Sequence, residues 1–168
     1  AGRDRVVRLS EINLGDELNL DENSVRGDLF RGILASHVMS PIVAPLCGDE
    51  TVDHAAEYFL RSRISSAPVV DKDGQLVGII SEKDLMSAMT SVEGWTRPIS
   101  ELMRPHVITY PVDTPVRVIY EFLCRVSMRR VIITDNGMPV GAISRASLLR
   151  WFRNLVLSKR GSKEKAAV

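Results

Sequence analysis

Apolar residues fall into two patterns along the chain: short continuous runs and longer stretches with helical spacing. Two short runs, Ala67–Val70 and Leu76–Ile80, flank a polar Asp-Lys-Asp-Gly turn, which predicts a hairpin of buried strands. From Thr51 to about Arg63 the apolar positions recur every three or four residues, which predicts an amphipathic helix capped by Thr51. A further strand is predicted before this helix, over Ile42–Leu46.

The second half of the chain predicts the same succession of elements. Its hairpin turns at Asp135-Asn136-Gly137, and both hairpins lead directly into helical patterns, so each half is predicted to run strand, helix, strand, strand, helix. The fold class is therefore α/β, with two βαββα halves. The further predicted elements are the helix 82–90, the strand 107–110, the helix 115–126, the strands 131–134 and 140–143, and a helix from about 145 through 156.

The flanking segments are predicted with less regular structure. Asn23-Ser24 can cap a helix that runs through about Ser36, and Thr90–Ser100 is predicted to be a linker whose Trp95 packs between the halves. We divide the chain into an N-terminal extension and helix (1–36), a first repeat (37–92), a linker with the second repeat (93–157) and a flexible basic tail (158–168) that is polar and frayed.

The two halves also match residue by residue, which indicates an internal repeat. The junction Gly78-Ile79-Ile80-Ser81-Glu82-Lys83-Asp84 recurs as Gly141-Ala142-Ile143-Ser144-Arg145-Ala146-Ser147, so a serine replaces the acid in the second copy. Earlier landmarks match in the same order: Val38-Met39-Ser40-Pro41 with Leu102-Met103-Arg104-Pro105, and Ala67-Pro68-Val69-Val70-Asp71 with Val131-Ile132-Ile133-Thr134-Asp135.

Composition narrows the function classes. The 168 residues are 45% hydrophobic with a formal net charge of +1, which suits one unit of two small halves and does not indicate binding to nucleic acid or a membrane. No run of about 18 apolar residues occurs, so no insertion into a membrane is expected. Two cysteines, Cys47 and Cys124, are too few for a disulfide framework, which favours reduced thiols and a cytoplasmic protein.

The chain shows no residue pattern typical of catalysis. The histidines His37, His54 and His106 lack metal-ligand spacing, and neither a Ser/His/Asp set nor a phosphate-cradling glycine-rich loop is present. We therefore expect a protein that is not an enzyme, has no metal site and requires no cofactor. The C-terminal region 145–168 carries seven bases and one acid, a pattern that is typical of solvated ends and leaves contact with nucleic acid or an acidic partner open.

Ser81 and Asp84 allow two interpretations. A serine at the start of a helix and an acid in its first turn are ordinary capping residues. A hydroxyl and a carboxylate at this spacing could also hold the two hydroxyls of a ribose, because a carboxylate accepts paired O–H bonds.

The repeated landmarks resemble a tandem pair of cystathionine β-synthase (CBS) domains, often called a Bateman module. The similarity covers roughly Val38–Phe152 and rests on the Met-Ser-Pro opening, the Ala-Pro-Val-Val-Asp strand and the Gly-Ile-Ile-Ser-x-x-Asp junction together. The resemblance implies two pseudo-symmetric repeats packed sheet to sheet, with ligand sites between them that take adenosine-containing molecules. It also implies a homodimer in which two modules form a flat disk.

The resemblance also implies which residues form the sites. One site would join Ser81 and Asp84, facing ribose, to an apolar pair that flanks a purine and two arginines that face phosphate, namely Val107, Ile108, Arg129 and Arg130. Neighbouring strand residues point to opposite faces, so at most one of the two arginines is expected to meet a given phosphate directly. The second, weaker site lacks the acid and the cations and would consist of Val43, Ala44, Ser65, Ser66, Ser144 and Ser147.

The sequence thus predicts a regulatory module that binds an adenosyl small molecule, with an adenine nucleotide such as AMP, ADP or ATP favoured by the arginines. S-adenosylmethionine, NAD and cyclic dinucleotides stay open. Two alternatives remain: a dimerisation module without a ligand, which Ser147 in place of an acid favours, and the regulatory part of a larger enzyme or transporter.

Overall fold

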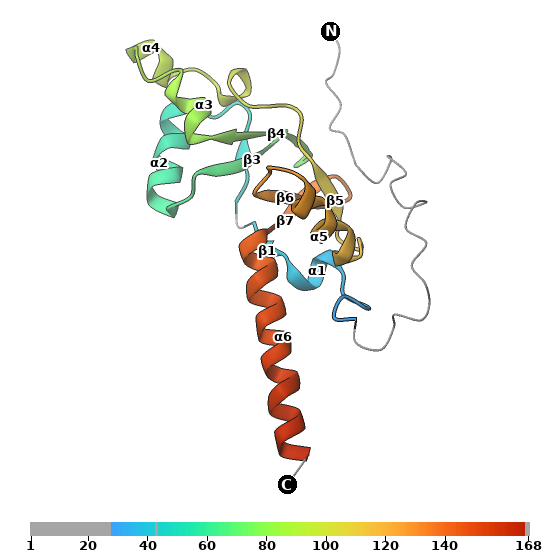
Figure 1. Cartoon of the computed structure of the whole chain (residues 1–168). Helices are drawn as coiled ribbons and strands as arrows, with labels where there is room; N and C mark the ends of the chain where they lie inside the picture. The colour runs from blue at the N-terminus through green and yellow to red at the C-terminus, as the bar shows by residue number, and fades with distance from the viewer. Residues whose placement is uncertain (1–27, 43, 167–168) are drawn as a thin grey trace.

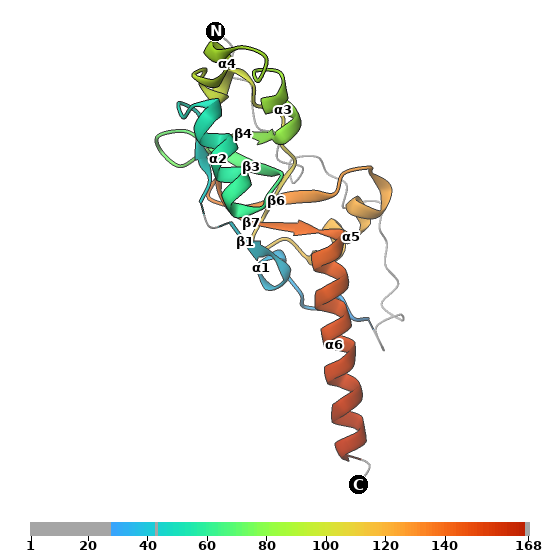
Figure 2. The same cartoon turned by 90° about the vertical axis from the view of Figure 1, so that its left-hand side faces the viewer.

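The structure, a computed structural model, describes residues 28–42 and 44–166, with side chains through Arg160. It forms a body of two small α/β halves from which one long helix projects (Figures 1 and 2). The helices are α1 (Ala35–Val38), α2 (Val52–Ser62), α3 (Glu82–Met86), α4 (Val92–Trp95), the 3₁₀ turn η3 (Ile99–Glu101), α5 (Val116–Arg125) and α6 (Arg145–Ala166). The strands are β1 (Ser40–Pro41), β2 (Leu46–Cys47), β3 (Ser66–Val70), β4 (Leu76–Ser81), β5 (Thr109–Pro111), β6 (Arg130–Asp135) and β7 (Met138–Ser144).

Each half repeats the same strand arrangement. In the first, β2 pairs parallel with β3, which pairs antiparallel with β4. In the second, β5 pairs parallel with β6, which pairs antiparallel with β7. The parallel pairs are joined by α2 and α5, because parallel strands need a crossover connection. The predicted order of two βαββα halves is therefore confirmed.

The segment that leads into each half packs on the other half's last strand. The residues before the first half form β1, which pairs with β7 through Ser40 and Ala142. The residues before the second half bond to β4: Arg104 N donates to Ile79 O, and Ile79 N donates to Arg104 O, both at 2.9 Å. We call residues 34–41 and 98–105 the lead-in segments. Their exchange ties the halves together through backbone hydrogen bonds.

Gly78 permits this close approach in the first half. A Cβ atom there would lie 2.9 Å from the carbonyl oxygen of Arg104 and 2.7 Å from Met103 Sδ. At the equivalent Gly141 a Cβ would lie 2.5 Å from Met39 Sδ. The expectation that a backbone passes close to Gly78 is thus confirmed.

The core has three parts. One apolar cluster lies between the second sheet and α5, and it includes Ala35 and Val38 of the first lead-in segment. Another fills the first half, and the second lead-in segment packs against it. A third, smaller cluster of Leu76, Val107 and Ile132 lies between the two sheets and confirms their sheet-to-sheet packing.

Both hairpin turns form as predicted. Asp71 Oδ1 accepts hydrogen bonds from Asp73 N and Gln75 N, and Gly74 adopts φ +78°. In the second turn Asn136 and Gly137 have φ of 49° and 81°, as a tight hairpin requires. The turns touch, because Leu76 N donates to Gly137 O at 3.0 Å.

The N-terminal part of the predicted fold needs correction. The helix expected over 24–36 starts outside the described residues; of its remainder, 29–32 form turns, Leu34 bridges to Pro115, and only Ala35 and Ser36 enter α1. Gly32, at φ +74°, breaks the helical path. The strand expected over 42–46 is also wrong apart from its last residue: pairing falls before it, in β1, and in β2, which shares only Leu46 with it. Pro45 has no N–H with which to join a ladder there.

Five smaller differences concern the ends of elements, the linker and the tail. The strand expected over 107–110 is shifted to β5, and α3 ends at Met86 rather than near Thr90. The linker contains α4 and η3, and Trp95 packs on the first half's core instead of between the halves. The polar tail expected to fray is helical as far as Ala166, because no Pro interrupts α6 and its one glycine, Gly161, is tolerated there.

Candidate functional site

A pocket of about 400 Å³ opens between the two halves. This volume lies in the range of small-molecule sites. The pocket draws on the end of β4, the second lead-in segment and the start of β6. Its lining residues are Ser65, Ser66, Ile79, Ser81, Arg104, His106, Val107, Ile108, Met128, Arg129, Arg130 and Ile132. We call it the first pocket.

The junction between β4 and α3 places Ser81 and Asp84 together. Ser81 is the N-cap of α3, and its backbone N–H donates to Asp84 Oδ2 at 2.8 Å. The Ser81 hydroxyl donates to the same oxygen at 2.6 Å. The carboxylate therefore closes the first turn of the helix, and its side chain is 15% exposed beside the pocket. The capping interpretation is confirmed, and it leaves carboxylate lone pairs for a ligand.

Arg104 reaches this junction from the second lead-in segment. Its Nε lies 3.5 Å from Asp84 Oδ2, and its Nη2 lies 3.5 Å from the Ser81 hydroxyl. The backbone bonds between Arg104 and Ile79 hold it there. The guanidinium is 62% exposed, so the pair is loose enough to rearrange around a ligand.

Three more cationic or titratable side chains line the same pocket. Arg129 and Arg130, at the start of β6, are both exposed, and His106 lies two residues beyond Arg104. With Arg104, the first pocket thus holds three arginines. The Asp84 carboxylate is the acid described at its edge, so the pocket carries an excess of positive charge that suits an anionic group.

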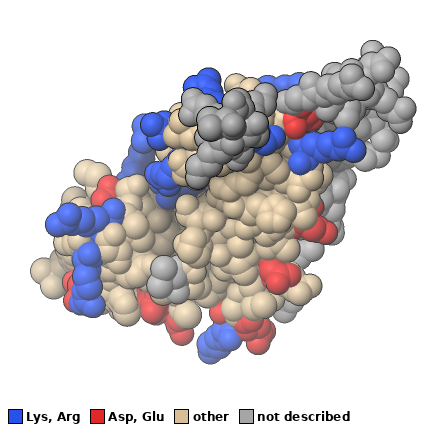
Figure 3. Space-filling model, turned by 90° about the horizontal axis from the view of Figure 1, so that it is seen from below, with Lys and Arg blue, Asp and Glu red and all other residues tan. Residues whose placement is uncertain are grey.

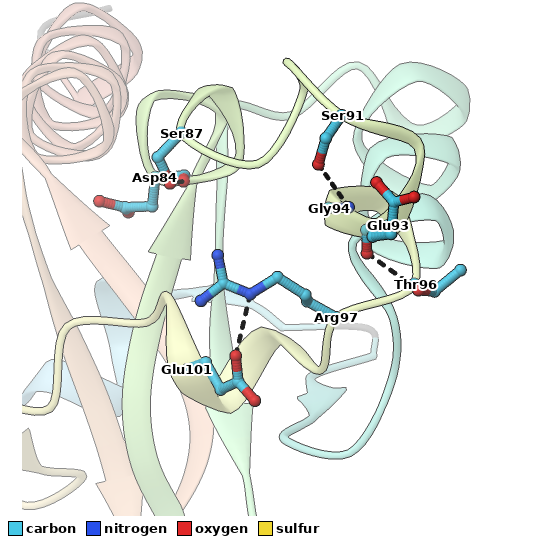
Figure 4. Close-up of polar contacts among 8 residues, drawn as sticks. All are labelled: Asp84, Ser87, Ser91, Glu93, Gly94, Thr96, Arg97 and Glu101. Atoms are coloured by element: carbon cyan, nitrogen blue, oxygen red, sulfur yellow. Dashed lines mark hydrogen bonds and ion pairs between the residues drawn. The ribbon is translucent and has the colours of Figure 1, made fainter.

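The linker residues nearby engage in local contacts. Ser91 accepts from Gly94 N, and Arg97 pairs with Glu101 at 2.9 Å, while the Asp84 carboxylate points away from them (Figure 4). Asp84 is thus directed away from the linker (Figure 4).

A second pocket of about 510 Å³ lies on the other side of the shared residues Ser66, Ile79, Arg130 and Ile132. Its remaining lining is mostly apolar. Those residues are Ser40, Pro41, Ile42, Ala44, Tyr58, Ser62, Ile64, Ala67, Pro68 and Ala142. Arg130 is its one arginine among the described lining residues.

The junction beside the second pocket caps itself with hydroxyls. Ser144 N donates to Ser147 Oγ at 2.7 Å, and Ser147 N donates to Ser144 Oγ at 3.1 Å. Ser147 is 7% exposed, and its hydroxyl also donates to Ser144 O. Neither serine lines the second pocket.

The structure brings together most of the residues predicted for the first site. Ser81, Val107, Ile108, Arg129 and Arg130 all line the first pocket, and Asp84 is bonded to Ser81 at its edge. The predicted second site is less coherent. Ala44 and Ser66 line the second pocket, Ser65 lines the first instead, Ser144 and Ser147 line neither, and Val43 lies outside the described residues.

Sequence reasoning missed Arg104, His106 and Met128. Arg104 stands where the first repeat has Ser40, and His106 where it has Ile42, so each replaces a neutral residue by one that can carry positive charge. That difference between aligned copies, in a segment thought to precede the site, was the available signal.

Within the described residues, no helix has the length and apolar character needed to cross a membrane. Nor do three or more His, Cys, Asp or Glu side chains come together as a metal site in that part of the chain. The cytoplasmic location stays a prediction.

Known proteins share this architecture. The protein MJ1004 of Methanocaldococcus jannaschii is 29% identical over 121 residues, which are 70% of this chain and 56% of that protein, so the chain spans about half of its length. The structure of CBSX2 in complex with AMP has a TM-score of 0.64 at 21% identity, over 74% of this chain and 98% of that one.

A second solved structure contains other adenosine compounds. The CBS domain pair of MJ0100, in complex with 5′-methylthioadenosine and S-adenosyl-L-methionine, has a TM-score of 0.57 at 26% identity, over 73% of this chain and 97% of that one. The CBS domain family itself matches residues 35–91 and 99–154, most of the chain. With two such matches in tandem and the exchanged halves described above, the chain belongs to the CBS domain family as a CBS domain pair.

Proposed function

We propose that the chain is a non-enzymatic sensor that binds an adenine nucleotide in the first pocket. The observation that carries this proposal is the partly buried Asp84 carboxylate at the edge of a pocket with three arginines. A ribose needs paired acceptors and a phosphate needs cationic donors, and the pocket offers both within one cavity of suitable size.

Each group has a distinct role in this proposal. Asp84 accepts the ribose hydroxyls, and Ser81 supports the carboxylate through its own hydrogen bond. Arg129, which lines the first pocket alone, faces the phosphate, and Arg130 lies between the two pockets. The half-buried Ile79 and Ile108 offer apolar surface to the purine.

Arg104 gives the ligand a way to act on the fold. In the described structure it pairs with Asp84, so a ribose that takes the carboxylate competes with this ion pair. Arg104 belongs to the second lead-in segment, whereas Asp84 belongs to the first half. Binding therefore favours arrangements of the two halves in which this contact is altered, and occupancy is passed on by that shift.

The relatives support the ligand class. CBSX2 was solved with AMP, and MJ0100 with 5′-methylthioadenosine and S-adenosyl-L-methionine, and the latter is 26% identical. The arginines favour a phosphorylated ligand over the sulfur-containing ones.

Assembly is a second candidate role, and exposed apolar residues on the helices favour it. Leu60 on α2 is 80% exposed, and Val118 and Tyr120 on α5 are 43% and 41% exposed. Such side chains suit a homodimer formed through the helices. Sedimentation of the chain with and without nucleotide separates the roles: a dimer that forms independently of ligand, with no binding detected, supports assembly alone.

The test of the sensor is a thermal-shift and calorimetry panel of AMP, ADP, ATP, adenosine, 5′-methylthioadenosine and S-adenosylmethionine. A ligand at about 100 times its dissociation constant should stabilise the chain by about 2.7 kcal/mol. The shift should be lost in Asp84→Ala and kept in Ser147→Ala, which alters the equivalent junction of the second half. A response that persists in Asp84→Ala, or no response to any ligand, contradicts the proposal.

A further inference from the structure

A short loop between α5 and β6, residues 126–129, carries Met128 and Arg129 into the first pocket. We call it the 126–129 loop. It has neither helical nor strand structure. Arg129 lines the first pocket and not the second. The position of this loop therefore decides where the Arg129 guanidinium can meet a phosphate.

The helices that precede the two aligned loops end in different ways. α2 ends at Arg63 in the left-handed conformation, at φ 53°, and the backbone N–H of Arg63 donates to Phe59 O. α5 ends at Val126, which is extended, at φ −110° and ψ 157°. A β-branched residue seldom adopts the left-handed conformation. The last carbonyl groups of α5 therefore need donors from elsewhere in the fold.

Arg145, the first residue of α6, supplies those donors. Its Nε donates to Leu123 O at 3.0 Å, and its Nη2 donates to Val126 O. A guanidinium at this position also suits the negative end of the α5 dipole. In addition, the backbone N–H of Arg145 donates to Arg129 O at 3.4 Å. One residue thus holds both the start and the end of the 126–129 loop.

The aligned residue in the first half is Glu82, and its chemistry differs. Glu82 N donates to Ser65 O at 3.0 Å, so the backbone bond is common to both halves. An ionised carboxylate cannot donate to carbonyl oxygens, so the contact made by the Arg145 side chain has no counterpart at Glu82. The loop held by a guanidinium is the one that carries Arg129, whereas the aligned loop ends in Ser65. This difference indicates a role for Arg145 that is tied to Arg129.

We propose that Arg145 is a positioning residue for Arg129 and thereby sets the affinity of the first pocket for phosphate. This inference rests on the proposed nucleotide site. Arg145 lies outside the lining of the first pocket, so it acts through the loop and not by contact with the ligand. When the loop is already held in place, phosphate binding does not incur the free-energy cost of ordering it. Adenosine has no phosphate, so its affinity should not depend on Arg145.

Calorimetry of the full chain with AMP and adenosine tests this coupling. Arg145→Gln should weaken AMP about fivefold, within the range of coupling between residues of one hydrogen-bond network, and leave adenosine unchanged. In the Arg129→Ala background, Arg145→Gln should cause no further loss, because Arg129 is the group that it positions. If the two substitutions weaken AMP independently, so that their effects multiply, Arg145 does not act through Arg129 and the proposal is overturned.

Two further variants separate position from charge. Figure 3 shows several Lys and Arg side chains on the face toward which α6 projects, so one arginine there is one charge among several. Arg150→Gln removes the same charge from α6 at an exposed residue outside both pockets and should leave AMP binding unchanged. Arg145→Lys keeps the charge and loses the planar fork of donors, so it should weaken AMP as well. AMP binding equal to the parent's in Arg145→Lys would assign the effect to charge and overturn the proposal.

Limited digestion of the folded chain with trypsin measures the loop without a ligand. Cleavage after Arg129 should be severalfold faster in Arg145→Gln than in the parent, because the loop opens more readily. Cleavage after Arg63, in the aligned loop of the first half, should keep its rate and is the internal control. Equal cleavage after Arg129 in both chains overturns the role of Arg145, whereas a parent chain that binds no nucleotide overturns the proposed function.

Discussion

The two junctions between a last strand and its following helix have the same cap and different chemistry. In the first half, Asp84 accepts hydrogen bonds from the backbone N–H and hydroxyl of Ser81. In the second, the hydroxyl of Ser147 accepts from the backbone N–H of Ser144 at 2.7 Å. A neutral hydroxyl is therefore sufficient to cap the helix. The negative charge of Asp84 exceeds what the fold needs, and the arginine that neutralises it comes from the other half.

The two pockets differ in charge as the two junctions do, with the charged groups concentrated in the first. The first has three arginines in its lining and the second shares one of them. Duplication thus produced two cavities of similar size, while polar groups for recognition are concentrated in one. The comparison implies one competent nucleotide site and one weak site in each chain, and the following changes test it.

Placing the charged residues of the first junction in the second half should produce the largest change in nucleotide binding. In Ser147→Asp with Ser40→Arg, both charges of the first junction are placed at the aligned positions. Calorimetry should then detect a second nucleotide-binding event where the parent chain shows one. Its affinity should be lower than that of the first site, because Ser65 and Ser66 stand where the first site has Arg129 and Arg130. A parent chain that already shows two equal sites would contradict the comparison.

Alanine at the two matched glycines should affect stability unequally. Gly78→Ala places a Cβ against the carbonyl oxygen of Arg104, part of the bridge between halves, so we expect a loss of about 1–3 kcal/mol in the free energy of unfolding. In Gly141→Ala the nearest atoms belong to the side chain of Met39, which is flexible, so the loss should be about 1 kcal/mol or less. Urea unfolding measures both, and equal losses would show that the backbone contact does not set the cost.

Removal of arginines should separate the phosphate from the nucleoside. Arg129→Ala should weaken AMP about tenfold, or about 1.4 kcal/mol, by removing a charge-assisted hydrogen bond. Binding of adenosine should be unchanged. Titration of both ligands measures the ratio, and Arg125→Ala, outside either pocket's lining, is a matched control. If adenosine weakens as much as AMP, Arg129 does not face the phosphate.

The smallest effect is expected at Asp28, distant in the fold from both pockets. A hydrogen bond from the backbone of Phe30 and the neighbouring Arg117 lower the pKa of Asp28. Because this pKa is lower in the folded chain than in the unfolded chain, the ionised carboxylate stabilises the fold above about pH 4. This stabilisation is lost as the pH falls through the pKa of the folded chain. The difference in melting temperature between the parent and Asp28→Asn should thus be small at pH 7 and vanish near pH 2. Nucleotide affinity at pH 7 should not change.

Much of the fold was predictable because local patterns and packing agree. The hairpins around Asp71–Gly74 and Asp135–Gly137 combine buried strands with turn residues that tolerate positive φ. The structure of the stretch around Pro45 was not predictable, because an extended apolar run resembles a strand whether or not a neighbouring strand pairs with it. Pairing of β1 with β7 depends on contacts distant in sequence, which no local pattern contains.

The site residues were predictable where the two aligned copies of the repeat differ. Ser81 and Asp84 stand out because their copy lacks the acid, and the arginines at 129 and 130 because their copies are serines. Arg104 was missed because its role arises from the exchange of lead-in segments, which brings it beside β4 of the preceding half. The assignment of Ser65 to the second site failed for a related reason: the pockets adjoin, and symmetry alone does not decide which one a residue lines.

The exchanged segments also set an order of folding as the chain is synthesised. The first half obtains its missing partner early, since Arg104 lies only 23 residues after Ser81, the last residue of β4. The second half depends on Ser40 and Pro41, made long before β7, so its sheet closes through a pairing of high sequence separation, which is a slow step. Until then Val38 and Met39 have no apolar surface to cover them, and a nascent chain held at this stage is open to aggregation.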